Sequence, residues 1–325
     1  MANIPKSAKT FAAVLVLLLL NSACKPSTSS SPPVSIIEKV KALPDDHVGS
    51  EIKYGYELFT RTAYYLGPKG SIKRLIRNRT SCQNCHLEGG TRLFSNHLLN
   101  AHAIYPQYRA REGKVLTLAE RINACVERPM NGRPLDHSSR EMKALLLYFK
   151  WIGTGTVVAA HRASDYPDHT LPVVLPDVPL SIERGAKVFA EHCARCHQPN
   201  GQGLLRADEI MYEYPPLWGS ESYHTGSSMH QNTILARFIK GTMPFGISTE
   251  HPELTDLEAL DVAAFINSHP RPSANFDQAK DYPNKQEKSF DFPYGPYADS
   301  FSEEQHRLGP FKPIQEYYLA LKIKQ

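Results

Sequence analysis

The chain lacks three features that mark large classes of protein: a long apolar run, many cysteines and an excess of charge of one sign. Its longest apolar run, residues 11–20, is well short of the ~20 residues that cross a bilayer, which excludes a multi-span membrane protein. Six cysteines in 325 residues exclude a small disulfide-stapled scaffold. With 37 basic and 33 acidic residues, the chain also lacks the basic excess of a general nucleic-acid binder, so we expect no nucleic-acid partner.

What remains is a composition typical of a soluble globular protein, with 41% apolar and 22% charged residues. At roughly 150 residues per domain, the length favours two domains, each large enough to bury a core. Any specific function must therefore be sought in local motifs.

The first residues have the pattern of an export signal, with Lys6 and Lys9 before the apolar run and the small residue Ala23 before Cys24. We therefore predict a signal peptide over residues 1–23 and a location in the periplasm. A cysteine at this place is typical of a bacterial lipoprotein. An acylated Cys24 would anchor the protein to a membrane through a flexible tether, residues 24–45, which is rich in Ser and Pro. Ordinary cleavage after Ala23 is the alternative.

Four of the remaining cysteines belong to two copies of one motif. The copies are Cys82, Cys85, His86 and Cys193, Cys196, His197. Such a C-x-x-C-H motif is the attachment signature of c-type haem, in which the thiols bind the haem covalently and the histidine binds its iron. A zinc site would need further Cys/His pairs, and a thioredoxin-like pair would not place histidine next in both copies. The chain is therefore predicted to carry two covalently bound haem c groups.

The second motif lies in a context typical of a small cytochrome c. Ser181 is placed to cap a helix that leads into the motif. Met243 comes 46 residues after His197 and is followed by proline, which makes it the best candidate for the distal ligand of the second haem iron. Met211 and Met229 are the alternatives.

Cys125 is the one cysteine left over. Arg121 lies four residues before it on a helix that the capping box of Thr117 and Glu120 predicts, so both side chains project from one helical face. Two interpretations stay open from the residues alone: Cys125 binds the iron of the first haem, or it is a small buried core residue. Residues 58–133 hold 13 basic and four acidic side chains. Such an excess of positive charge attracts small anions or an acidic redox partner, and charge alone does not distinguish between these two kinds of partner.

Several segments of the sequence resemble the dihaem c-type thiosulfate dehydrogenases, cytochromes that form tetrathionate. The resemblance covers residues 53–314 and is carried by residues 87–91, 105–111, 120–125, 130–135 and 294–297. It implies that Cys125 is the distal ligand of the first haem and Met243 that of the second. It also implies that Arg111 and Arg121 line the substrate pocket. Pro129 departs from the family pattern, which has serine there.

The activity that the resemblance implies is the oxidation of two thiosulfate ions to tetrathionate, with electrons passed to a periplasmic cytochrome or a similar redox protein. Arginine suits such a site because it is always charged and binds oxyanions through two donors. A cysteine sulfur at the iron could also hold a sulfane sulfur covalently. The alternatives are a tetrathionate reductase that uses the same site and a non-catalytic dihaem electron-transfer cytochrome.

We predict a mainly α fold with two cytochrome c domains in tandem. The first, residues 46–165, holds the catalytic haem, and the second, residues 181–270, holds the relay haem. A Pro-rich linker, residues 166–180, joins them. Residues 271–325 form an irregular C-terminal extension, and we expect its ten aromatic side chains to pack on the domains.

Overall fold

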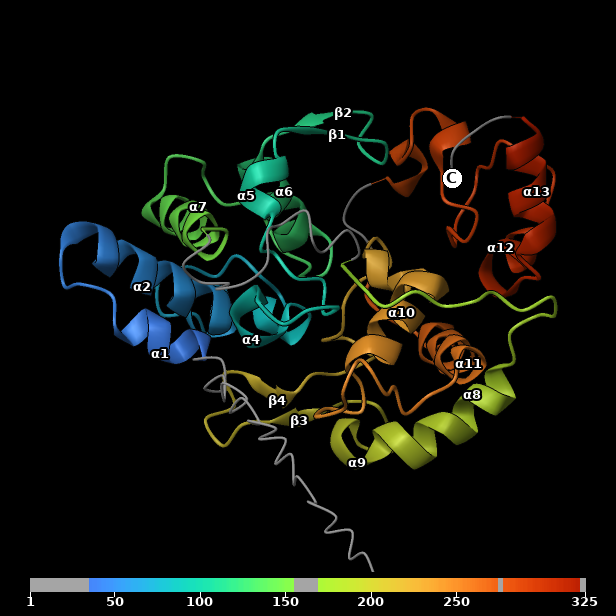
Figure 1. Cartoon of the computed structure of the whole chain (residues 1–325), viewed down its shortest axis with the longest axis horizontal. Helices are drawn as coiled ribbons and strands as arrows, with labels where there is room; N and C mark the ends of the chain where they lie inside the picture. Colours follow the sequence, from blue (N-terminus) through green and yellow to red (C-terminus); the bar gives the residue numbers. More distant parts are fainter. Residues whose placement is uncertain (1–34, 155–168, 274–276, 322–325) are drawn as a thin grey trace, which may run out of the picture. The chain divides into compact units, whose positions relative to one another are not determined.

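The computed structural model describes residues 35–154, 169–273 and 277–321 (Figure 1). The predicted signal peptide, Cys24 and the first part of the tether lie outside these residues, as do the end of the first predicted domain and the start of the linker. The chain from Ser35 onward forms one compact unit. Within the described part, no helix is both long and apolar enough to span a membrane.

Helices dominate the described residues, which confirms the predicted mainly α class. The elements around the first haem motif are α1 (Ile36–Lys41), α2 (His47–Thr60), α3 (Thr62–Leu66), η1 (Cys82–Asn84), α4 (Leu87–Gly90), α5 (Ala101–Ile104), β1 (Gln107–Arg109), β2 (Lys114–Leu116), α6 (Leu118–Glu127) and α7 (Arg140–Ile152). Those around the second are α8 (Ile182–Val188), η3 (Phe189–Cys193), α9 (Ala194–His197), β3 (Leu204–Leu205), β4 (Tyr212–Tyr214), η4 (Ser228–His230), α10 (Asn232–Thr242) and α11 (Asp256–Ser268).

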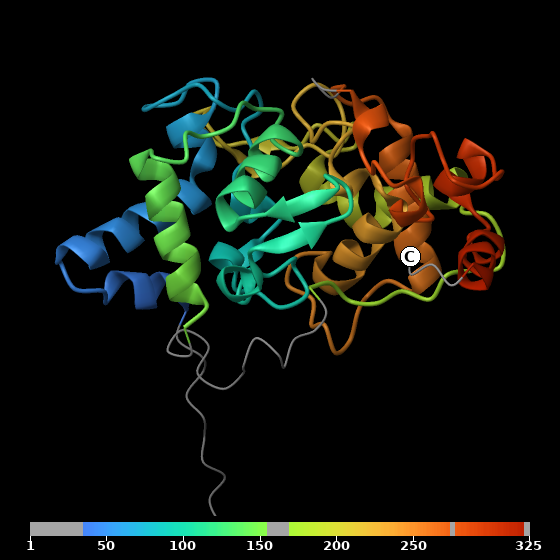
Figure 2. The same ribbon diagram turned by 90° about the horizontal axis from the view of Figure 1, so that it is seen from above.

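The core of the first region forms where α2 packs against α7 (Figures 1 and 2). Gly55 allows the two backbones to approach closely, because a Cβ there would overlap the carbonyl of Ala144. Phe59 and Tyr148 are fully buried in this core. The Tyr148 hydroxyl donates a hydrogen bond to the carbonyl of Gly89 at 2.6 Å. This bond ties α7 to the segment that follows the first haem motif.

The second region repeats this design with α8 packed against α11. Gly185 allows the approach, because a Cβ there would overlap the carbonyl of Asp261. The Asp261 carboxylate accepts hydrogen bonds from the Arg184 guanidinium, at 2.6 Å to Nε, and from the backbone N–H of Ser181, at 2.7 Å. The Ser181 hydroxyl accepts from the Arg184 N–H, so the predicted cap of this helix is confirmed.

A two-stranded antiparallel hairpin precedes α6 in the first region. Gln107 of β1 pairs with Leu116 of β2, and the chain then enters α6 directly. The predicted capping box is confirmed, with the Thr117 hydroxyl accepting from the Glu120 N–H at 3.3 Å and the Glu120 carboxylate accepting from the Thr117 N–H at 2.8 Å. The hairpin and the cap together set where α6 begins, and therefore where Cys125 lies.

The C-terminal extension consists of short helices and irregular segments. Its elements are η5 (Gln278–Lys280), η6 (Lys285–Glu287), α12 (Glu303–Leu308) and α13 (Lys312–Ala320). Phe292, Phe311, Ile314 and Tyr318 are almost completely buried. Phe311 belongs to the apolar core of the second region. The Tyr318 hydroxyl donates to the Asp299 carboxylate at 2.6 Å, which closes the extension on itself.

Candidate haem sites and the arginine cluster around Cys125

The first C-x-x-C-H motif sits at the turn η1. Thr62 holds Cys82 there, because its hydroxyl accepts from the Cys82 N–H at 3.1 Å and donates to the Cys82 sulfur at 3.3 Å. Nδ1 of His86 lies 2.6 Å from the carbonyl oxygen of Asn96 and donates to it. This hydrogen bond leaves Nε2 of His86 for an iron ion, the arrangement typical of a metal-binding histidine.

The second motif spans η3, a π-helical turn, and α9. Nδ1 of His197 lies 2.8 Å from the carbonyl oxygen of Pro215, so this ring also keeps Nε2 for a metal. Phe189, four residues before Cys193, packs against the Trp218 ring with 5.0 Å between centroids. The two histidines are thus oriented in the same way by unrelated carbonyl groups.

The motif cysteines also fit thioether attachment to haem. All five cysteines of the described residues are free thiols. Burial raises the pKa of Cys82 to about 12, that of Cys85 to about 11 and that of Cys193 to about 12. None of the four motif thiols is engaged in a disulfide, so all four are free to form thioether bonds with the haem vinyl groups.

Cys125 differs from the motif cysteines in its electrostatic surroundings. Burial raises the pKa of its thiol, but Arg121, His86 and Arg109 lower it by more, so that it falls to about 7. Nη1 of Arg121 donates to the sulfur at 3.4 Å from one turn earlier in α6. The structure therefore brings Cys125 together with Arg121 and with the histidine of the first haem motif.

Arg109 at the end of β1 is a residue that the sequence did not single out from the other basic side chains. It is half-buried, and its charge acts on the Cys125 sulfur. The sequence placed it two residues before Arg111, but nothing in that spacing shows which of the two approaches Cys125.

Arg111 is almost completely buried, and its contacts run to the second region and to the extension. Nη1 donates to the carbonyl of Gly226 at 3.2 Å and to the Ser228 hydroxyl at 3.4 Å. Nε lies 3.7 Å from the carboxylate of Asp281, and the guanidinium lies over the Phe292 ring at 4.9 Å. Burial lowers the pKa of Arg111 from the usual arginine value. The structure thus gives this predicted substrate residue a set of fixed partners.

The three candidate methionines of the second region occupy different places. Met243 caps the C-terminus of α10 and packs in the same apolar cluster as Cys193. Met229 is buried in that cluster as well. Met211 is turned toward the first motif, since its sulfur accepts a hydrogen bond from the Ser81 hydroxyl at 3.8 Å. Of the three, Met211 is therefore the one that packs beside the first haem motif.

A loop of the second region supports the end of α6. Nε2 of His224 donates to the carbonyl of Glu127 at 2.7 Å, while Nδ1 accepts from the N–H of Gly226 at 2.8 Å. The carbonyl of Gly226 accepts from Arg111 and also from Arg128, at 3.2 and 3.4 Å. The loop therefore holds two arginines of the first region with one oxygen atom.

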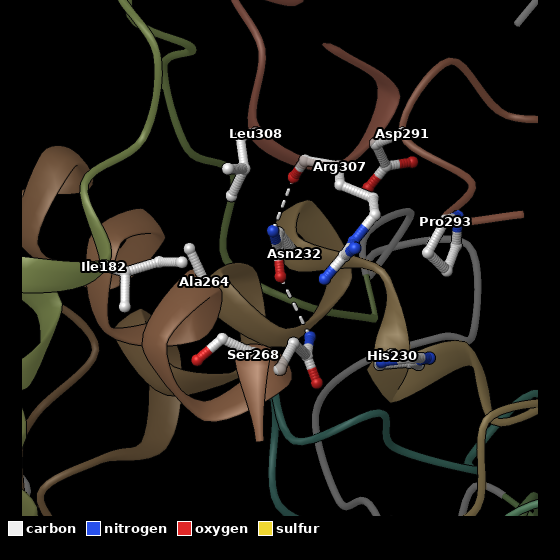
Figure 3. A pocket seen from close by; sticks show the side chains of 10 residues that line it. Ile182, His230, Asn232, Ala264, Ser268, Asp291, Pro293, Arg307 and Leu308 are labelled. Atoms are coloured by element: carbon white, nitrogen blue, oxygen red, sulfur yellow. Dashed lines mark hydrogen bonds between the residues drawn. The ribbon is translucent and has the colours of Figure 1, made fainter. Parts of the chain in front are cut away.

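A small pocket lies between the second region and the extension (Figure 3). Asn232 lies at its centre, donating to the carbonyl of Arg307 at 2.6 Å and accepting from Asn267 at 3.0 Å. The Asp291 carboxylate at its rim accepts from the Thr233 N–H at the start of α10. These polar groups bind one another, so we assign the pocket a structural role.

Two oriented histidines, four attachment cysteines and helical packing define a tandem c-type cytochrome. Residues 73–158 match the model of the SoxA/TsdA cytochrome c domain, and residues 182–270 match that of cytochrome c. The protein therefore carries two covalently bound haem c groups, as predicted.

Characterised relatives narrow this class. The chain is 36% identical to the thiosulfate dehydrogenase of Stutzerimonas stutzeri strain A1501 over 233 residues, which is 71% of each chain. It is 34% identical to that of Psychrobacter arcticus over 264 residues, 79% of this chain and 74% of the relative. The structure of the thiosulfate dehydrogenase TsdBA of Marichromatium purpuratum superposes with a TM-score of 0.64 at 34% identity, covering 76% of this chain. This chain spans about half of that one, 51%. The chain belongs to the thiosulfate dehydrogenase family, which confirms the resemblance seen in the sequence.

Proposed function

We propose that the protein is a thiosulfate dehydrogenase, which oxidises two thiosulfate ions to one tetrathionate and passes two electrons to a redox protein. The observation that carries this proposal is the pairing of Cys125 with Arg121 beside His86. A cytochrome that only relays electrons needs neither an unpaired cysteine nor a half-buried arginine in contact with that cysteine next to its haem. The relatives named as thiosulfate dehydrogenases support the same assignment.

The proposed haem ligands fall into two sets. For the first haem, Cys82 and Cys85 form the covalent bonds, and His86 and Cys125 bind the iron. For the second, Cys193 and Cys196 form the covalent bonds, and His197 and Met243 bind the iron. Two bound haem groups could take up one electron each, which matches the two electrons that the reaction releases. We assign the first haem to the substrate site because the charges of Arg121 and Arg109 act on Cys125, next to the histidine of its motif. We assign the second haem to electron relay.

The arginines reduce the cost of bringing two dianions together. Thiosulfate carries two negative charges, and two such ions repel each other strongly where water is excluded. We assign Arg121 to the anion nearest Cys125, because its guanidinium already reaches the sulfur. We assign Arg111 a second positive charge at this site, which the Asp281 carboxylate 3.7 Å away balances in part.

We assign Cys125 the role of holding the first thiosulfate covalently. Its thiolate sulfur would form a bond to the sulfane sulfur with the loss of two electrons, which two bound haem groups could take up, one each. The sulfane sulfur of the second thiosulfate then bonds to that bound sulfur, and the bond to Cys125 breaks. Tetrathionate leaves, and Cys125 keeps the electron pair of the broken bond as a thiolate.

Turnover of the purified holoprotein tests the activity and its direction. We expect thiosulfate to reduce an artificial one-electron acceptor with tetrathionate as the product. The same preparation is then given tetrathionate and a reduced donor. Faster reaction in this second assay would favour the reductase alternative, and no reaction in either would leave an electron-transfer cytochrome.

We base a proposal for the location on the predicted signal peptide. We propose export to the periplasm, acylation of Cys24 and electron delivery to a periplasmic cytochrome. The supports are the short apolar run and the tether rich in Ser and Pro. The intact mass of the mature protein tests the first two proposals, because an unmodified N-terminus at Cys24 or elsewhere contradicts acylation.

A further inference from the structure

Asp281 of the C-terminal extension is a buried carboxylate in contact with Arg111 and Arg128. It lies outside both matched cytochrome domains, which end at residues 158 and 270. Only 4% of its surface is exposed. A carboxylate this deeply buried needs charged partners, because burying an unpaired charge is costly.

Its partners are two arginines of the first region. The carboxylate accepts from Nη1 and Nη2 of Arg128 at 2.9 and 2.7 Å, a two-bond pairing. It also lies 3.7 Å from Nε of Arg111. Arg128 follows Cys125 by three residues, so this pairing joins the extension to the helix that carries the reactive sulfur. The Glu112 carboxylate also lies near this group, 3.8 Å from Nε of Arg128.

The backbone around Asp281 is docked on the hairpin that carries Arg111. The N–H of Tyr282 donates to the carbonyl of Arg111 at 2.8 Å. The turn residue Gly113 abuts Pro283, since a Cβ on that glycine would lie 2.7 Å from the proline ring. The Lys285 ammonium donates to the carbonyl of Asp281 at 2.9 Å. The backbone that carries the Asp281 carboxylate is therefore held in place by these contacts.

Two buried guanidinium groups repel each other unless an anion lies between them. Arg111 and Arg128 share the Gly226 carbonyl, and the Asp281 carboxylate is the charged group that both contact. We propose that Asp281 is a positioning residue for thiosulfate binding, which keeps Arg111 and Arg128 side by side in the orientation that receives the substrate anion. This inference rests on the proposed function.

Two substitutions of Asp281 distinguish the effect of the carboxylate's position from the effect of its charge. Asp281→Glu keeps the charge but displaces the carboxylate by one methylene group, and Asp281→Asn keeps the shape but removes the charge. We expect both to raise KM for thiosulfate about tenfold while kcat changes less than about twofold. If Asp281 acted only through its negative charge, Asp281→Glu would leave KM unchanged. Asp281→Asn would then lower KM, because it removes a negative charge near the substrate anion.

The control is Glu287→Gln in the same extension. Its carboxylate accepts from the Tyr108 hydroxyl at 2.9 Å, so it also links the extension to the hairpin, but through a tyrosine. We expect wild-type KM for this variant. Arg128→Lys gives a second test from the other side of the pair, because lysine keeps the charge and loses the two-bond pairing. We expect Arg128→Lys to raise KM as the Asp281 variants do, and this variant still tests the pairing if the Asp281 variants fold poorly.

Binding of tetrathionate to the fully oxidised holoprotein, measured by calorimetry, gives a readout without turnover. We expect about tenfold weaker binding in Asp281→Glu and Arg128→Lys, with haem content and both haem potentials unchanged. Wild-type affinity in both of these variants, or tighter binding in Asp281→Asn, would overturn the proposal. Thiosulfate turnover by the wild-type protein tests the proposed function separately. If the wild type is active and the variants bind tetrathionate as the wild type does, the positioning role alone is refuted.

Discussion

Replacing Arg121 by alanine removes one guanidinium from beside the Cys125 sulfur and leaves α6 able to form, because alanine is the best helix former. In the structure Nη1 of Arg121 lies 3.4 Å from that sulfur, one helical turn away. The charge interaction with Cys125 raises the pKa of Arg121, so the guanidinium is charged under all assay conditions. The variant therefore deletes one fixed positive charge at the place where we assign the first thiosulfate.

The size of the effect follows from the kind of contact that is lost. A hydrogen bond between a charged donor and an oxyanion contributes about 1.5–3 kcal/mol. We therefore expect Arg121→Ala to lower kcat/KM for thiosulfate about ten- to hundredfold. Arg121→Lys keeps the charge but has no planar fork, so its kcat/KM should lie between those of wild type and Arg121→Ala.

Steady-state kinetics with an artificial acceptor measure this directly, and haem absorbance shows whether both haems are present. Arg133→Ala is the matched control, because Arg133 belongs to the same basic stretch but is exposed. It should behave as wild type. Unchanged kinetics in Arg121→Ala would refute the substrate role, and an equal loss in Arg133→Ala would show that only the overall field matters.

Three further predictions concern other parts of the molecule. Cys125→Gly should abolish turnover and change the spectrum of the first haem alone, while Cys125→Met should restore a sulfur ligand without activity; full activity of the Met variant would rule out the covalent role. Met243→Gly should change the potential and spectrum of the second haem and leave tetrathionate binding intact, and an unaltered thioether signature would transfer the ligand role to another methionine. Tyr148→Phe removes the hydrogen bond to Gly89 and leaves a buried carbonyl without it, so thermal unfolding should show a loss of about 1–3 kcal/mol, whereas an unchanged melting temperature would show that this bond adds nothing.

Much of the candidate site could be predicted because its signals are local. The haem motifs place three chemical groups within five residues, and the capping box of Thr117 and Glu120 lies within four residues of sequence. The pairing of Arg121 with Cys125 follows from helical spacing alone. Such short-range patterns are readable before any packing is known.

The rest of the site depends on contacts between distant parts of the chain. Arg128 and Asp281 are 153 residues apart, and neither sits in a pattern that points to the other. The acceptors of the haem histidines are backbone carbonyls, of Asn96 and Pro215, and every residue has a carbonyl. The partners of Arg111 likewise come from the second region and the extension. These contact partners can be identified only in the folded structure.

The loop that carries His224 and Gly226 bears on how such enzymes are divided and recombined. The second cytochrome region contributes the oxygen atom that holds Arg111 and Arg128, and a ring nitrogen that secures the end of α6. The first region on its own would keep every residue of its haem motif and of its basic cluster, yet would lose this support. We therefore expect that the first region is not a transferable module, and that a fusion or truncation that preserves activity keeps the two regions and their contact surface together.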